Sequence, residues 1–199
     1  SALGVDENSI TIAGGFGKIV LGMDDDAADA YNLDESDLIA EDDAPSVTSA
    51  TIGTSSSIGS DDAMKVAYHL PAMGGLTAGI SHTDRTRAGG TDTTSYGARY
   101  SMEAAGASIT LGYAAVQDEN ATQDVDQENM GMKIVSGDIS LIISQGGSES
   151  NDEDVENQGA SISYKMPNGM TVGAYTIKSE DDLDTGEEYS RSGLEVQYT

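Results

Sequence analysis

The feature that most constrains the fold is an alternation of apolar and small polar residues that recurs along most of the chain. The clearest run alternates Ala, Ile, Tyr and Met with Gly, Ser, Ser and Lys over residues 159–166, and residues 108–113 and 194–198 follow the same rule. Successive side chains of a β-strand point to opposite faces, so a period of two predicts strands with one apolar and one polar face. Counted along the chain, the alternation predicts eleven strands.

The links between the predicted strands are alternately short and long. The short links carry turn residues, as in Gly14-Gly15, 136–138 and 166–169. The long links cover residues 24–62, 83–94, 117–129, 146–157 and 178–190. In an up-and-down antiparallel sheet every second link lies at the same end, so we expect tight turns at one end and long loops at the other.

The negative charge follows the long links. The 199 residues contain 9 Lys and Arg and 35 Asp and Glu, for a net charge of −26, which excludes a basic nucleic-acid-binding surface. All acids lie in the long links or ahead of the first strand except Glu103, Asp138 and Glu195. A soluble protein adapted to high salt would instead spread carboxylates over the polar face of every strand.

Two architectures can use strands of this kind. A soluble sandwich packs the apolar faces into a core, whereas a transmembrane barrel turns them toward lipid and keeps the polar faces around water. No apolar run approaches the roughly 20 residues that a membrane helix needs. The predicted strands run about eight to ten residues, which fits either architecture.

Tyrosine favours the membrane architecture. Four tyrosines lie on apolar strand faces near the short links or the end of the chain, where a barrel carries its aromatic girdle: Tyr68, Tyr100, Tyr164 and Tyr198. The alternative is that tyrosine is simply a frequent strand residue.

Five cations fall on the polar faces of five different predicted strands: Lys18, Lys65, Arg99, Lys133 and Lys165. If the sheet closes, they project into the lumen as a wall of positive charge that faces the loop acids across a transverse field. The alternative is a row of solvated side chains on an exposed sheet face.

No sequence motif points to catalysis or to a cofactor. The chain has no Cys and two His, and it contains no P-loop, nucleophile elbow or His-Glu-x-x-His sequence. We therefore expect no enzyme, no cofactor and no dedicated metal site. The acid clusters at 24–26, 152–154 and 181–184 lack EF-hand spacing and predict solvated loops, with weak divalent cation binding left open.

These residues resemble the Gram-negative general-diffusion porin family. The matching pieces are residues 9–22, which look like the strand pair before the family's constriction loop, and the pattern at 159–164 and 193–198. The resemblance implies an all-β, antiparallel up-and-down transmembrane β-barrel, with residues 1–199 forming one domain in the outer membrane of a Gram-negative bacterium. Bacterial single-chain barrels have even strand numbers, so about eleven strands predict an incomplete or open barrel, an internal portion of a longer porin.

The resemblance also implies a function. It predicts passive diffusion of small hydrophilic solutes and ions through a homotrimer in outer-membrane lipid, and it makes residues 24–62 the loop that folds into the pore. The net charge adds the hypothesis of a cation preference. The constriction acids would be Asp24, Asp25, Asp26, Asp29, Asp34, Glu35, Asp37, Glu41, Asp42 and Asp43.

Two other classes stay open at this point. The first is a soluble or secreted acidic β-rich module that binds calcium or acts in adhesion, and the second is a carbohydrate-active β enzyme. The apolar strand faces distinguish them from a porin. A second layer of the same molecule covering Ile109, Leu111, Ile162 and Tyr164 would contradict the membrane architecture.

Overall fold

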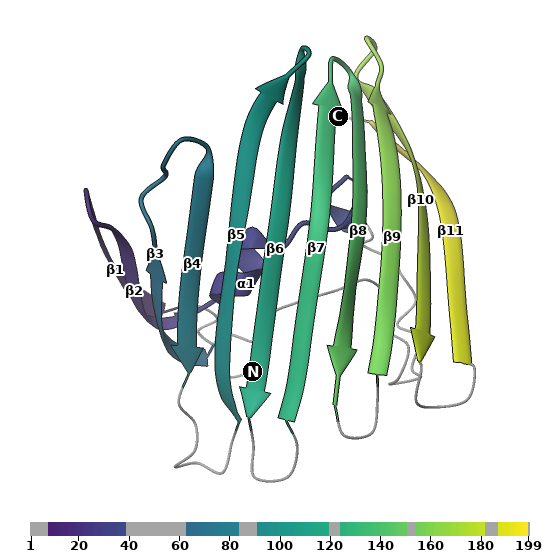
Figure 1. The fold of residues 1–199 in the computed structure, drawn as a ribbon. Helices are drawn as coiled ribbons and strands as arrows, with labels where there is room; N and C mark the ends of the chain where they lie inside the picture. The colour runs from purple at the N-terminus through teal and green to yellow at the C-terminus, as the bar shows by residue number, and fades with distance from the viewer. Residues whose placement is uncertain are drawn as a thin grey trace, which may run out of the picture.

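The computed structural model describes residues 8–38, 63–83, 91–119, 124–150, 154–181 and 187–198. It contains one antiparallel sheet of eleven strands in sequence order, as the alternation predicts (Figure 1). The strands are β1 Asn8–Gly14, β2 Gly17–Asp24, β3 Ala63–His69, β4 Leu76–Thr83, β5 Asp92–Ala104, β6 Ala107–Glu119, β7 Asp124–Ser136, β8 Ile139–Glu149, β9 Asp154–Lys165, β10 Met170–Asp181 and β11 Glu187–Tyr198. Among the described strands β1 and β11 do not pair with each other, so the sheet is an open, curved wall.

Tight turns join the strands at one end of the sheet, at the top of Figure 1. Between β5 and β6, only Ala105 and Gly106 separate the paired residues Ala104 and Ala107, and both central residues have positive φ, 51° and 80°. Two positive φ values suit the right-handed twist of the flanking strands. The turns therefore lie where the short links predict them.

The strands from β5 to β11 are longer than predicted, whereas β1 to β4 have 7 or 8 residues. β5, β6 and β7 each have 13 residues, and β8 to β11 have 11 or 12. They extend into the predicted long links, so that Asp118, Glu149 and Glu180 lie on strands rather than in loops. The alternation disappears there because both faces of the sheet are polar, while the backbone pairing continues.

The apolar residues form an outer face that nothing in the described chain covers. Leu111, Ile162 and Tyr164 are 42, 48 and 43% exposed, and no described element packs over them as a second layer. Such a face suits lipid and not water, because monomeric soluble proteins rarely expose a large contiguous apolar patch. No helix of the described residues is long and apolar enough to cross a membrane.

The opposite, inner face carries the only two helices in the described residues. They are α1, Ala27–Tyr31, and the 3₁₀-helix η1, Glu35–Leu38. α1 packs against β3 to β6, and η1 packs against β8 and β9 (Figure 1). A small buried cluster of Ala28, Ala114 and Val116 joins α1 to the inner face of β6.

Candidate functional site

The segment after β2 crosses the inner face of the sheet. Residues 24–38 pass over β3 to β6 as α1 and reach β8 and β9 as η1. We call residues 24–38 the inserted segment. It is the described part of the predicted 24–62 loop, and residues 39–62 lie outside the described residues.

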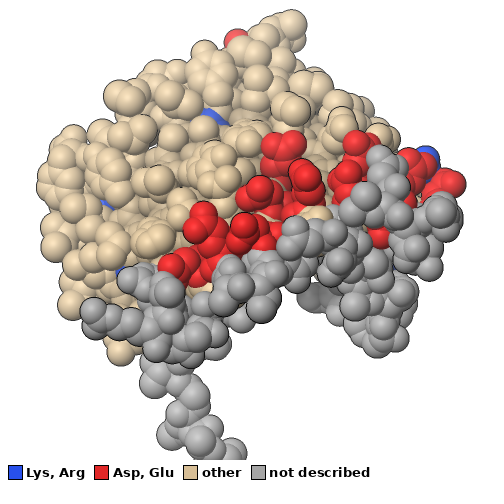
Figure 2. Space-filling model, turned by 60° about the horizontal axis from the view of Figure 1, so that its bottom comes forward, with Lys and Arg blue, Asp and Glu red and all other residues tan. Residues whose placement is uncertain are grey.

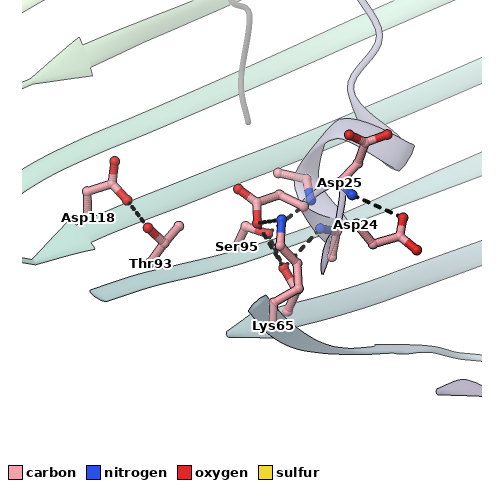
Figure 3. Close-up of polar contacts among 10 residues, drawn as sticks. Asp24, Asp25, Lys65, Thr93, Ser95 and Asp118 are labelled. Carbon is pink, nitrogen blue, oxygen red and sulfur yellow. Dashed lines mark hydrogen bonds and ion pairs between the residues drawn. The ribbon is translucent and has the colours of Figure 1, made fainter. Parts of the chain in front are cut away.

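A buried ion pair anchors the start of the inserted segment. Lys65 Nζ lies 2.8 Å from Asp26 Oδ1, with side-chain exposures of 0 and 1%. The backbone N–H groups of Ala27 and Ala28 donate to the hydroxyls of Ser81 and Ser95, at 3.0 and 3.2 Å. Figure 3 shows Lys65 and Ser95 converging on the first residues of α1. Because the serines satisfy these helix N–H groups, the Asp26 carboxylate is left to pair with Lys65.

The middle of the inserted segment packs against a stripe of four glycines. The stripe consists of Gly79, Gly97, Gly112 and Gly131 on the inner faces of β4 to β7, where Gly79 pairs with Gly97 and Gly112 with Gly131. A Cβ on Gly97 would lie 2.7 Å from Tyr31 Cβ, and a Cβ on Gly112 would lie 2.8 Å from Leu33 Cβ. The stripe therefore lets the backbone approach the wall more closely than any side chain would allow.

Side-chain hydrogen bonds hold the rest of the segment. The Tyr31 hydroxyl lies 2.9 Å from His69 Nδ1, and Arg99 Nε donates to the Tyr31 carbonyl at 3.2 Å. Asn129 Nδ2 donates to Asn32 Oδ1 at 2.6 Å and to the Leu33 carbonyl at 3.1 Å. The inner wall thus fixes the inserted segment from Asp26 to Leu33.

The predicted constriction acids take different positions. Asp26 and Asp34 are buried, whereas Asp25, Asp29 and Asp37 are exposed on the inner side of the sheet. Asp24, at the end of β2, accepts hydrogen bonds from the Ser9 hydroxyl at 2.8 Å and from the Asp25 N–H at 3.0 Å. Glu35 begins η1, and Glu41, Asp42 and Asp43 lie outside the described residues.

Two of these acids, Asp29 and Asp37, have raised pKa values. Burial raises the pKa of Asp29, and the neighbouring Asp25 and Asp26 raise it further. Burial and Asp34 raise the pKa of Asp37, against the lowering effect of Arg99 and Lys133. Desolvation is the largest cause for both carboxyls, and neighbouring acids add to it.

The five predicted cations all lie on inner-face positions, but they are not equivalent. Lys65 differs from the expectation of a lumen-facing charge because the inserted segment buries it against Asp26. Arg99 is half-buried, and its Nη2 lies 4.0 Å from Asp37 Oδ2. Lys133 is also half-buried, and Lys18 and Lys165 are exposed. Lys18 lines a pocket with Asp24, Asp25 and Asp29, whereas Lys165 lies at the short-turn end of β9.

The four tyrosines of the predicted girdle lie on the outer face near the short turns. Tyr100, Tyr164 and Tyr198 are 42, 43 and 77% exposed. Tyr68 is half-buried and donates a hydrogen bond to the carbonyl of Phe16, in the β1–β2 turn. Their contact with a membrane interface stays a prediction.

Sequence reasoning missed the residues that hold the inserted segment. Ser81, Ser95 and Asn129 are small polar residues on inner faces, like many others that make no such contact. The glycine stripe is equally inconspicuous, since glycine, serine and threonine are common on the polar faces. The one usable signal is that Gly79, Gly97, Gly112 and Gly131 occupy polar-face positions on four consecutive strands.

The exposed apolar outer face, the polar inner face and the inserted segment together define a β-barrel protein of the outer membrane. The model of the Gram-negative porin family matches residues 1–199, and the chain belongs to that family. A comparison with curated protein sequences found no match.

Solved structures share this fold. The outer-membrane protein OmpT of Vibrio cholerae has a TM-score of 0.66 at 13% identity, covering 97% of this chain and 65% of its own. An anion-selective porin from Comamonas acidovorans has a TM-score of 0.62 at 15% identity, covering 94% of this chain and 60% of its own. A further porin has a TM-score of 0.65 at 17% identity, covering 96% and 70%. The chain thus spans less than two thirds of the first two proteins, and these identities show the fold alone.

Proposed function

We propose that the protein forms a water-filled channel for passive diffusion of small hydrophilic solutes and ions across the outer membrane. The observation that carries the proposal is the inserted segment, fixed on the polar side of a sheet whose other side is apolar. In a closed barrel this geometry narrows an aqueous lumen and leaves the lipid-facing side undisturbed. The channel performs no chemistry and uses no cofactor.

A preference for cations follows from the distribution of charge. The net charge is −26, and the exposed Asp25, Asp29 and Asp37 lie on the inserted segment. The positive wall is weaker than its composition suggests, because Asp26 neutralises Lys65 and Arg99 faces Asp37. Acids around an aqueous path raise the local cation concentration, so cations should pass more readily than anions.

The test is a reversal-potential measurement in planar bilayers under a gradient of potassium chloride. We expect a potential whose sign shows potassium to be more permeant than chloride. Replacing Asp29 and Asp37 with Asn should move the potential toward zero, while Asp138→Asn, at the β7–β8 turn, should leave it unchanged. A chloride preference, or equal permeabilities, would contradict the cation preference, and no conductance at all would contradict the channel.

The organisation of the chain and its assembly belong to the same proposal. We take residues 1–199 as a single porin domain or a fragment of one, the loop at 24–62 as its constriction, and a homotrimer in outer-membrane lipid as the working assembly. Chemical cross-linking of the detergent-solubilised protein should give a trimer band. A monomer at every protein concentration would contradict that assembly.

The competing proposal of a soluble calcium-binding module has less support. Leu194, Val196 and Tyr198 are 84, 61 and 77% exposed, an arrangement that a soluble sheet avoids. Within the described ranges, no group of three or more His, Asp or Glu side chains could hold a metal ion. A porin should keep its circular-dichroism spectrum when a chelator is added, whereas a calcium module should lose structure.

A further inference from the structure

A small pocket lies on the inner side of the sheet, between α1 and the strands β2 and β3. Its volume is about 240 Å³. Charged and polar side chains surround a floor of two buried apolar residues, Val20 and Ala67, which are 3 and 2% exposed. These charged and polar side chains include Lys18, His69, Asp24, Asp25 and Asp29.

The register of β2 and β3 gives this pocket a basic end and an acidic end. Lys18 pairs with His69, and two residues further along β2 Val20 pairs with Ala67. Asp24 ends β2 beyond this apolar row, and Asp25 follows it. Residues two apart on a strand point to the same face, so basic, apolar and acidic positions follow one another along the pocket.

The charged groups at the two ends of the pocket do not form ion pairs with each other. None of the ion pairs among the described residues includes Lys18, Asp25 or Asp29, although all three line the pocket. Asp26, the fourth acid there, is already paired with Lys65. Burial raises the pKa of Asp29, and so do Asp25 and Asp26; a bound cationic group would offset the repulsion among these three carboxylates. Opposite charges that share a pocket without touching can be satisfied together by a molecule that carries both charges.

We propose that this pocket binds a small zwitterion, a free α-amino acid with a short aliphatic side chain. Lys18 binds the carboxylate, Asp25 and Asp29 bind the ammonium group, and the side chain contacts Val20 and Ala67. The inference rests on the proposed channel and deepens it, because it names one class of solute that pauses beside the inserted segment.

Binding is tested by equilibrium dialysis of the detergent-solubilised protein with three radiolabelled probes. Alanine carries both charges, ethylamine lacks the carboxylate, and propionate lacks the ammonium group. We expect alanine to be retained at least about tenfold more strongly than either of the others. Equal retention of ethylamine and alanine would overturn the proposal by showing a simple cation pocket, and so would retention of none of the three.

Matched variants locate the site. Lys18→Gln should abolish the advantage of alanine over ethylamine, and Asp29→Asn should abolish its advantage over propionate. Lys165→Gln removes an exposed inner-face cation that lies outside the pocket and should change neither ratio. Unchanged ratios in Lys18→Gln would overturn the assignment. Dialysis does not depend on conductance, so a protein that conducts but shows no alanine preference refutes only this inference, whereas one that does not conduct refutes the proposed channel.

Discussion

Burial decides what a charged residue on the inner face can do. Lys65 and Lys165 both occupy inner-face positions, on β3 and β9, yet the first is enclosed under the inserted segment and the second is exposed. The alternation predicts the face of both residues. It does not predict that one of them is covered, because the covering segment comes from elsewhere in the sequence.

The Asp26–Lys65 pair should be important for stability. Lys65→Ala leaves a buried carboxylate without its counter-charge, which costs about 3–5 kcal/mol. Lys165→Ala, at an exposed site, should change the free energy of unfolding by less than about 0.5 kcal/mol. Urea unfolding in detergent micelles, followed by tyrosine fluorescence, compares the two. Equal midpoints would contradict the role given to the ion pair.

The raised pKa values of Asp29 and Asp37 predict a pH-dependent selectivity. Carboxyls with raised pKa values take up protons at a higher pH than ordinary aspartates, whose reference value is 3.8. Because their unfolded pKa is lower, both groups disfavour the folded state at neutral pH, and acidification relieves that effect as it removes their charge. The cation preference should therefore weaken as the pH falls, with a midpoint above 3.8.

Reversal potentials recorded across a pH series measure this midpoint. In a protein carrying both Asp29→Asn and Asp37→Asn, the remaining pH dependence should move to lower pH. An unshifted midpoint would assign the effect to other acids.

The inserted segment depends on backbone proximity as well as on side-chain bonds. Gly112 faces both Leu33 Cβ and the Tyr31 carbonyl, where a Cβ would lie 2.8 and 3.1 Å away. The wall under the segment is therefore shaped by the absence of side chains. The sequence shows glycines at polar-face positions of four consecutive strands, but it does not show that a segment lies against them, because small residues are common on the polar faces of such a sheet.

Gly112→Ala should displace the inserted segment without unfolding the sheet. The added methyl group forces Leu33 away from the wall, so limited proteolysis within residues 24–38 should become faster while the strand signal in circular dichroism persists. Gly15→Ala, in the β1–β2 turn with nothing within 4 Å of the added Cβ, is the matched control. Equal cleavage rates in the two variants would contradict the seating role of the stripe.

The strand extensions show where the pattern stops being informative. Over the apolar band the alternation predicts which residues face outward, as Leu111 and Ile162 show. Toward the loop end acids occupy both faces, with Asp118 on the inner face, hydrogen-bonded to Thr93 at 2.6 Å (Figure 3). Backbone pairing continues there without an apolar face to reveal it.

At the scale of the whole molecule, the acids form a band across the outer surface near the loop end. Figure 2 shows Asp and Glu gathered there, below a body of the sheet on which few charged residues are visible. The register sets carboxylates directly opposite one another: Asp126 pairs with Glu149, and Glu149 with Asp154. Glu180 also pairs with Glu188, but Lys178 forms ion pairs with both of these carboxylates. Like charges at opposite positions of neighbouring strands destabilise a sheet.

Salt should therefore stabilise this protein. The distance beyond which exposed charges are screened from each other falls from about 10 Å at 0.1 M salt to about 3 Å at 1 M. The unfolding midpoint should therefore rise as the sodium chloride concentration increases through this range. Glu149→Gln removes the middle carboxylate of a three-strand row and should reduce the salt dependence, whereas Glu103→Gln, near the β5–β6 turn, should not. A midpoint that is independent of salt would show that the repulsion is negligible.

The central claim is that one face of this sheet meets lipid and the other meets water. The chain contains no Cys, so a single introduced cysteine can be labelled without interference from other thiols of the chain. The neighbouring residues Thr110 and Leu111 on β6 point inward and outward, and each is replaced by Cys in protein reconstituted into liposomes. We predict that a water-soluble thiol reagent labels Thr110→Cys, whereas a fluorophore on Leu111→Cys is quenched by spin-labelled lipid. The reverse assignment, or equal access of water and lipid to both positions, would contradict the account.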